Sequence, residues 1–145
     1  MPVLNLRIAP LQNPQRYQTL ARALTRITAE VLGKPAEVTT VTIDDLPAAR
    51  WYVGGNDVER PTAQLDLRIA AGTNTPAQKQ EFIRQAFLEL QRQLGYGHPL
   101  EAASYVLVHE LPAGDWGYGG ITQEARRSLA SPLDAAAIAA HEGLA

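Results

Sequence analysis

An internal repeat constrains the fold of this chain more than any other feature of its sequence. Residues 46–55, which contain Leu-Pro-Ala, a tryptophan and Gly-Gly, return as residues 111–120 with these residues at the same spacing. An earlier segment with strand-like alternation, residues 4–9, returns as residues 65–70. Repetition on this scale indicates one structural unit made twice, and each copy alone is too small to bury its apolar face.

Hydrophobic periodicity predicts the order of elements within each copy. The first copy has a strand at 3–9, a helix that begins at Asn13-Pro14 and ends at Gly33, and a strand at 38–43. The second has a strand at 65–69, a helix that begins at Thr75-Pro76 and ends near Gly95, and a strand at 103–109. We predict the apolar stripes of the helices at Tyr17, Leu20, Ala21, Leu24, Ile27 and Val31, and at Ile83, Ala86, Phe87, Leu90 and Leu94.

These elements predict an α/β (α+β) fold in which two tandem β-α-β units form a four-stranded mixed sheet with two helices on one face. The domain extends over residues 1–127 and consists of the repeats 2–60 and 61–127. Residues 128–145 form a C-terminal tail, for which the alanine-rich stretch 135–141 predicts a short helix.

Composition excludes several classes of function. A net charge of −2 offers no basic field for nucleic acid, and the absence of cysteine excludes disulfides and thiolate catalysis. The three histidines lack metal-ligand spacing, so we expect no metal site and no cofactor. No signal peptide or membrane span is visible, and we expect a cytoplasmic protein without a nucleic-acid or membrane partner.

The chain opens with Met1-Pro2-Val3, and each copy of the repeat ends in an aromatic residue followed by Gly-Gly. In these features it resembles the tautomerase superfamily, whose simplest member is 4-oxalocrotonate tautomerase. The resemblance covers nearly all of residues 2–127 and implies a fused, two-unit member. Its length is that of the cis-3-chloroacrylic acid dehalogenase, malonate semialdehyde decarboxylase and macrophage migration inhibitory factor groups. The resemblance also implies a homotrimer.

Pro2 is the predicted catalytic residue. Removal of Met1 would leave a secondary amine; an α-amino group titrates at roughly 7.7–8.0, and partial burial lowers that pKa. The resemblance implies that this amine is the general base of a keto–enol tautomerase, an isomerase acting on a small 2-oxo or 2-hydroxy-enoic acid. The second copy has Ala63 at the matching place, so we expect one base per chain and three per trimer. If Met1 is retained, the nitrogen is an amide and cannot act.

The family's carboxylate-binding arginines are missing. The resemblance puts them just after the first strand and on the second strand, where this chain has Gln12 and Thr40, and Thr73 and Tyr105 in the second copy. Without a bidentate arginine clamp a diacid substrate is disfavoured. The dehalogenase and decarboxylase groups also use an arginine at the start of the second helix, which is absent here.

Other side chains are therefore candidates for substrate binding: Tyr105, Trp116, Trp51, His109 and Arg7. All of these except Tyr105 have a competing interpretation. We favour an ion pair with Asp66 or Asp44 for Arg7 and a structural hydrogen bond for His109, while interface packing is an even alternative for the tryptophans.

Two further functions stay open. One is a hydratase, dehalogenase or decarboxylase of short unsaturated or 3-oxo acids, in which Pro2 works as a cation. The other is a non-catalytic trimeric scaffold that kept the fold and lost the arginines. The pH profile separates the two chemistries, since a tautomerase gains rate as Pro2 loses its proton.

Overall fold

The computed structural model describes residues 1–10 and 13–129. The chain divides into two units, which we describe separately. The first consists of Met1–Ile69 and Asn74–His109, and the second of Ala70–Thr73 and the chain from Glu110 onward. Gln12 and the predicted tail helix at 135–141 lie outside the described residues.

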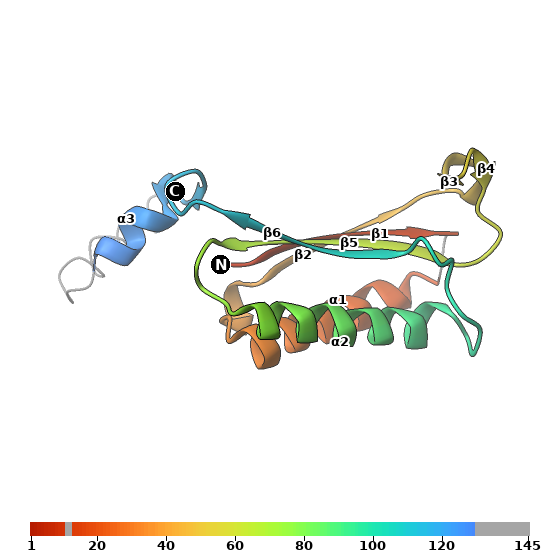
Figure 1. Cartoon of the computed structure of the whole chain (residues 1–145), viewed down its shortest axis with the longest axis horizontal. Helices are drawn as coiled ribbons and strands as arrows, with labels where there is room; N and C mark the ends of the chain where they lie inside the picture. Colours follow the sequence, from red (N-terminus) through yellow and green to blue (C-terminus); the bar gives the residue numbers. More distant parts are fainter. Residues whose placement is uncertain (11–12, 130–145) are drawn as a thin grey trace. The chain divides into compact units, whose positions relative to one another are not determined.

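A four-stranded sheet in the order β2-β1-β5-β6 forms the framework of the first unit. Strand β1 (Val3–Ala9) pairs in parallel with β2 (Thr40–Asp45) and antiparallel with β5 (Thr62–Ala70). Figure 1 shows β6 (Tyr105–Leu111) running in the direction of its neighbour β5. The predicted mixed sheet is therefore confirmed, and the two copies of the repeat meet where β1 pairs with β5.

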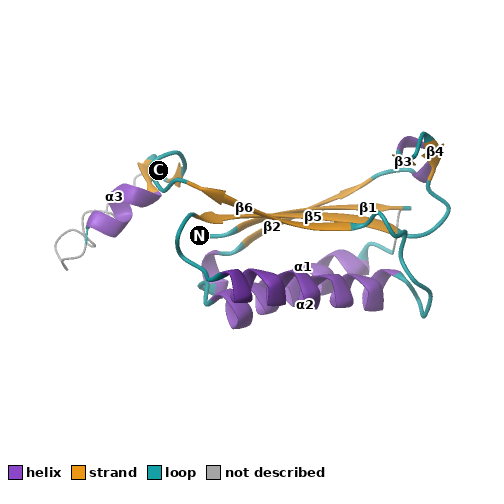
Figure 2. Cartoon of the chain, in the orientation of Figure 1, coloured by secondary structure: helices purple, strands orange, loops and turns teal. Residues whose placement is uncertain are grey.

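Helices α1 (Gln15–Leu32) and α2 (Pro76–Leu94) cover one face of this sheet, as Figure 2 shows. Thr75 caps α2 in a reciprocal capping box with Gln78. At α1 the Asn13 Oδ1 accepts the N–H of Gln15 at 3.0 Å. The end of α1 is tied to the start of α2, because Asn74 Nδ2 donates to the carbonyl of Leu32 at 2.9 Å.

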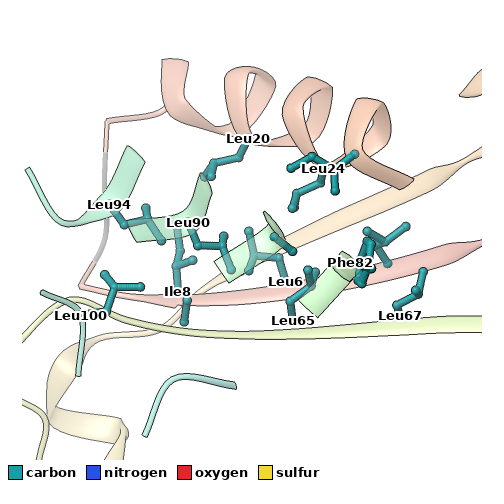
Figure 3. Packing of buried hydrophobic residues seen from close by; sticks show 14 of the residues in the cluster. Leu6, Ile8, Leu20, Leu24, Leu65, Leu67, Phe82, Leu90, Leu94 and Leu100 are labelled. Carbon is teal, nitrogen blue, oxygen red and sulfur yellow. The ribbon is translucent and has the colours of Figure 1, made fainter. Parts of the chain in front are cut away.

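The core lies between the helices and the sheet (Figure 3). Leu4, Leu6 and Ile8 of β1 are at most 1% exposed, as their alternation predicts. The predicted stripe of α2 is wrong at one position, because Ile83 is 39% exposed and the adjacent Phe82 is fully buried. Phe82 lies four residues from Ala86 and eight from Leu90, so a helix places these three on the same face.

Short elements complete the chain. In the first unit they are the 3-10 turns η1 (Ala36–Val38) and η2 (Ala48–Arg50) and the hairpin strands β3 (Tyr52–Val53) and β4 (Asn56–Asp57). In the second they are β7 (Gly117–Tyr118), β8 (Ile121–Thr122) and helix α3 (Gln123–Ser128). Both Gly-Gly pairs have positive φ at both glycines, which the tight hairpin turns require. No helix among residues 1–10 and 13–129 is long and apolar enough to cross a membrane.

Candidate functional site

Pro2 lies immediately before β1 and is buried. Its carbonyl accepts the N–H of Thr40 at 3.1 Å, which joins it to the start of β2. Strand alternation puts Pro2 on the same sheet face as Leu4, the face that the helices cover. Burial in such surroundings disfavours a charged amine, so this position suits a base once the nitrogen is free.

Lys34 is a cation at the same end of the sheet. It was not among the predicted site residues, because the resemblance implies arginines. It is half-buried and follows Gly33, the left-handed residue that ends α1. The chain then passes through η1 to Thr40, whose N–H binds the Pro2 carbonyl. A signal was present: Gly33-Lys34-Pro35 returns in the second copy as Gly97-His98-Pro99. An ammonium group here can bind one carboxylate as a point charge.

The structure does not bring Tyr105 to Pro2 within one chain. Its neighbour Ser104 accepts the N–H of Ala63 through its hydroxyl at 3.1 Å, and Ala63 pairs with Ile8. Ile8 is six positions along β1 from Pro2, or roughly 20 Å at 3.3 Å per residue. Tyr105 therefore lies towards the opposite end of the sheet, with its side chain 58% exposed.

Arg7 is also separated from Pro2. It lies five positions along β1 and is exposed, and alternation directs it to the face opposite the helices. Asp44 is its register neighbour on β2, yet Arg7 makes no ion pair with any described residue. The ion pair that we favoured for Arg7 is therefore not formed.

His109 contacts Asp66 on the sheet face opposite the helices. The Nε2 of His109 lies 2.6 Å from Asp66 Oδ1, and both side chains are partly exposed. Burial by itself would raise the pKa of the Asp66 carboxyl, but hydrogen bonds from His109 and Gln64 and the charges of His109 and Arg68 hold that pKa below its ordinary value. This contact agrees with the structural hydrogen bond that we favoured for His109. A role of His109 as an acid or base stays a prediction.

Trp51 belongs to the hairpin that follows β2. It is half-buried, and its carbonyl accepts the N–H of Val58 at 3.0 Å. Figure 1 shows this β3–β4 hairpin at the end of the sheet away from the N-terminus. Trp51 and Pro2 of one chain thus lie at opposite ends of the first unit.

The second unit carries Trp116 and, close to it in sequence, an arginine that we did not predict. Trp116 lines a cavity of about 290 Å³, and its buried Nε1 has no hydrogen-bond partner in the described residues. Arg126 stacks on the ring of Tyr118 with 3.5 Å between the guanidinium carbon and the ring centroid, and donates to the Tyr118 carbonyl. A donor without an acceptor beside a cavity is a candidate ligand contact.

No cluster of metal-ligating side chains emerges from the described residues. They contain no group of three or more His, Cys, Asp or Glu side chains that could hold a metal ion. A cavity of about 630 Å³ follows α1 and the free edge of β2. It contains none of the predicted site residues, and its size alone assigns no chemistry to it.

Comparison with known proteins agrees with these features. A family model described as tautomerase enzyme matches residues 2–60. The structure of a wild-type fused 4-OT asymmetric trimer is 27% identical, with a TM-score of 0.75, and the match covers 89% of this chain and 99% of that one. No curated protein sequence matches the chain significantly.

Two further structures share the fold at lower identity. A wild-type fused 4-OT symmetric trimer is 22% identical, with a TM-score of 0.75 over 86% of this chain and 98% of that one. A member of the cis-3-chloroacrylic acid dehalogenase family is 20% identical, with a TM-score of 0.73 over 95% of this chain and 99% of that one. The tautomerase family model thus matches the first repeat and a fused 4-OT matches across both, so the chain has the fold of the tautomerase superfamily, with two fused β-α-β units.

Proposed function

We propose that this protein is a keto–enol tautomerase of a small 2-oxo or 2-hydroxy-enoic acid, with Pro2 as the general base after Met1 is removed. The observation that carries the proposal is the buried Pro2 at the start of β1 in a tautomerase fold. In the reaction the Pro2 nitrogen accepts the proton of the 2-hydroxyl group, and the enol becomes a ketone. The same proton is then delivered to the substrate carbon, which restores the free amine.

The substrate class follows from the charge near Pro2. Lys34 is a cation that the first unit offers at this end of the sheet, and a lysine binds a carboxylate without the bidentate geometry of arginine. Arg68 also lies at this end, as the register partner of Val3, but alternation along β5 puts it on the sheet face opposite the one that holds Pro2. A monocarboxylate therefore fits better than a diacid. Trp51 and Trp116 are the proposed aromatic walls for a flat conjugated substrate.

We propose that the active protein is a homotrimer in which a neighbouring subunit completes each Pro2 site. Trp51 and Tyr105 lie far from Pro2 of their own chain, so they can serve a Pro2 site only from another copy. Strands β2 and β6 are the edges of the sheet and offer unpaired backbone groups for association. The fused 4-OT proteins that share the fold form trimers.

The proposal is tested by the ultraviolet ketonisation rate of phenylenolpyruvate, an enol acid with one carboxylate. Wild type, Pro2→Ala and the control Pro14→Ala are compared, with intact mass to establish removal of Met1. We expect a rate above buffer that falls at least about 100-fold in Pro2→Ala, the range for loss of a general base. Pro14 lies before α1, so its variant should keep the wild-type rate.

The competing functions give different results in the same assay. A rate that rises with pH as Pro2 loses its proton supports the base, whereas a rate that falls supports a hydratase, dehalogenase or decarboxylase with a cationic Pro2. Equal rates in wild type and Pro2→Ala, or a retained Met1, would overturn the proposal in favour of the scaffold.

A further inference from the structure

A second cavity lies in the first unit where the chain enters the second copy of the repeat. Its volume is about 470 Å³, within the range of small-molecule sites. The loop before β5 and the loop after α2 form its walls, and the N–H of Glu101 donates to the Pro61 carbonyl at 2.8 Å beside it. We call this the second-repeat cavity; its lining residues are Glu59, Arg60, Pro61, Gly95, Tyr96, His98 and Pro99.

The repeat relates this cavity to the Pro2 end of the sheet. Ala63 in the second copy stands where Pro2 stands in the first. His98 likewise stands where Lys34 stands, since each follows a glycine and precedes a proline. In the first copy only Met1 and Pro2 precede the first strand, β1. In the second copy residues 59–61 lead into the matching strand, β5. Residues 59–61 form one wall of the cavity.

Side chains that can donate hydrogen bonds to an anion line the cavity. Arg60 and His98 line it beside one carboxylate, Glu59. Neither the Arg60 guanidinium nor the His98 ring makes an ion pair or a side-chain hydrogen bond with any described residue. Both groups are thus available to an anionic ligand.

Tyr96 adds a flat aromatic surface. It is 57% exposed, and its left-handed backbone, with φ of 49°, is uncommon for a bulky residue. The guanidinium carbon of Arg16 lies 4.9 Å from the centroid of its ring, so a cation already stacks on this tyrosine. The cavity therefore combines donors for a carboxylate with a ring on which an unsaturated body can stack.

We propose that the second-repeat cavity binds a small carboxylate with a flat aromatic or unsaturated body and leaves it chemically unchanged. Arg60 has the planar donor geometry that a carboxylate accepts, and His98 lines the same cavity. No base is present at the matching position, because the nitrogen of Ala63 is a peptide amide that donates to Ser104. This inference rests on the cavity and the repeat, and it holds whether or not Pro2 is catalytic.

Benzoate is the probe, and the readout is the amide NMR shifts of Tyr96, Gly97 and His98 in the full chain. We expect saturable shifts in wild type and a Kd at least tenfold weaker in Arg60→Ala, since a hydrogen bond to a charged group is lost. Arg22→Ala, an exposed arginine on α1 outside this cavity, should bind like wild type. Benzamide, which has the same ring without the charge, should not shift these amides.

Absence of saturable shifts up to about 10 mM benzoate, or an unchanged Kd in Arg60→Ala, would overturn the inference. Lys34→Ala separates it from the proposed catalytic function. That variant should impair ketonisation and leave the shifts at Tyr96 unchanged. Loss of these shifts in Lys34→Ala would place benzoate at the Pro2 end of the sheet and would also overturn the inference.

Discussion

The two copies of the repeat differ most where each one enters the sheet. The first has Pro2 immediately before β1, where the proposed function requires a free secondary amine. The second enters through Thr62 to Ala63, whose N–H donates to the Ser104 hydroxyl at 3.1 Å. Duplication doubles the sheet and the helices, but a chain has only one amino terminus, so only one copy can offer the base.

The copies also differ on the sheet face away from the helices. In the first, Asn5 accepts a hydrogen bond from Thr42 at 2.6 Å, and both side chains are neutral. In the second, Asp66 takes the place of Asn5 and contacts His109. Asn5 and Asp66 are direct register partners across β1 and β5. The first network has no titratable side chain, whereas both side chains of the second can titrate.

Among the predicted changes, addition of residues before Pro2 should reduce catalytic activity the most. Two residues, Gly-Ser, placed before Pro2 in a processed protein turn its nitrogen into an amide. We expect kcat/KM for phenylenolpyruvate to fall at least about 100-fold. The same two residues added at the C-terminal end serve as the control. If the extended protein keeps half of its activity, a free Pro2 nitrogen is not required. The proposed difference between the two copies would then be wrong.

Substitution of Lys34 should have a smaller effect on catalysis, and substitution of His98, its counterpart in the second copy, should have none. Lys34→Ala should raise KM about tenfold or more, because a charge-assisted contact to the substrate carboxylate is lost. Lys34→Arg should restore most of the affinity, and His98→Ala should leave both kcat and KM unchanged. Steady-state kinetics of the three variants measure this difference. An equal rise of KM in His98→Ala would mean that both copies contribute to turnover.

The helix starts should differ modestly in stability. Thr75→Ala removes the acceptor of the Gln78 N–H at 3.1 Å and opens the capping box of α2. We expect a loss of about 1 kcal/mol in the free energy of unfolding. Asn13→Ala removes one bond to Gln15 and should cost about half of that. Urea unfolding at one fixed chain concentration measures both, and a larger loss for Asn13→Ala would contradict the expectation.

We expect the smallest effect from low pH, which should reduce the contribution of the Asp66–His109 network to stability and leave that of the Asn5–Thr42 network unchanged. The folded-state pKa of Asp66 is below its ordinary value of 3.8, so its contribution to stability is complete above that value and is lost as pH falls through the folded pKa. His109→Ala leaves the burial that raises this pKa and removes a hydrogen bond that lowers it. We expect the carboxyl to titrate at higher pH, and stability to decline from a higher pH.

Carboxyl NMR titration of Asp66 in wild type and His109→Ala measures this change directly. Asn5→Ala is the matched control, because the hydrogen bond between Thr42 and Asn5 contains no titratable group. Its loss should leave the decline of stability at low pH unchanged. An unchanged Asp66 titration in His109→Ala would show that the contact with His109 does not control the carboxyl.

Local sequence patterns predicted the helices and strands. The errors concern single positions, namely one strand boundary and one buried helix residue. Alternation placed Leu4, Leu6 and Ile8 in the core correctly, because every second residue of a strand lies on one face. The strand predicted from residue 38 begins at Thr40 instead, since Ala36–Val38 forms a 3-10 turn. In α2 the choice of Ile83 over Phe82 was wrong because both are apolar, and only packing against the sheet decides which is buried.

The candidate site was predicted less completely, because its residues are distant in sequence. Pro2 was predicted as the base from its place in the repeat and stays a prediction, whereas Tyr105 and Arg7 were grouped with it without knowledge of the register. Pairing of Ile8 with Ala63, whose N–H in turn binds Ser104, sends Tyr105 towards the other end of the sheet. Lys34 was not predicted, because its place at the Pro2 end of the sheet depends on how η1 returns the chain to Thr40, whose N–H binds the Pro2 carbonyl.

The sequence by itself determined the duplication, the order of strands and helices, and the place of Pro2 before the first strand, which Ala63 takes in the second copy. These are local or repeated properties that residue spacing records directly. The tertiary structure decided that β1 and β5 join the copies antiparallel, that His109 meets Asp66, and that a cavity lies beside Tyr96. Such neighbours are set by strand register and by helix packing across the sheet, and no local spacing rule specifies either.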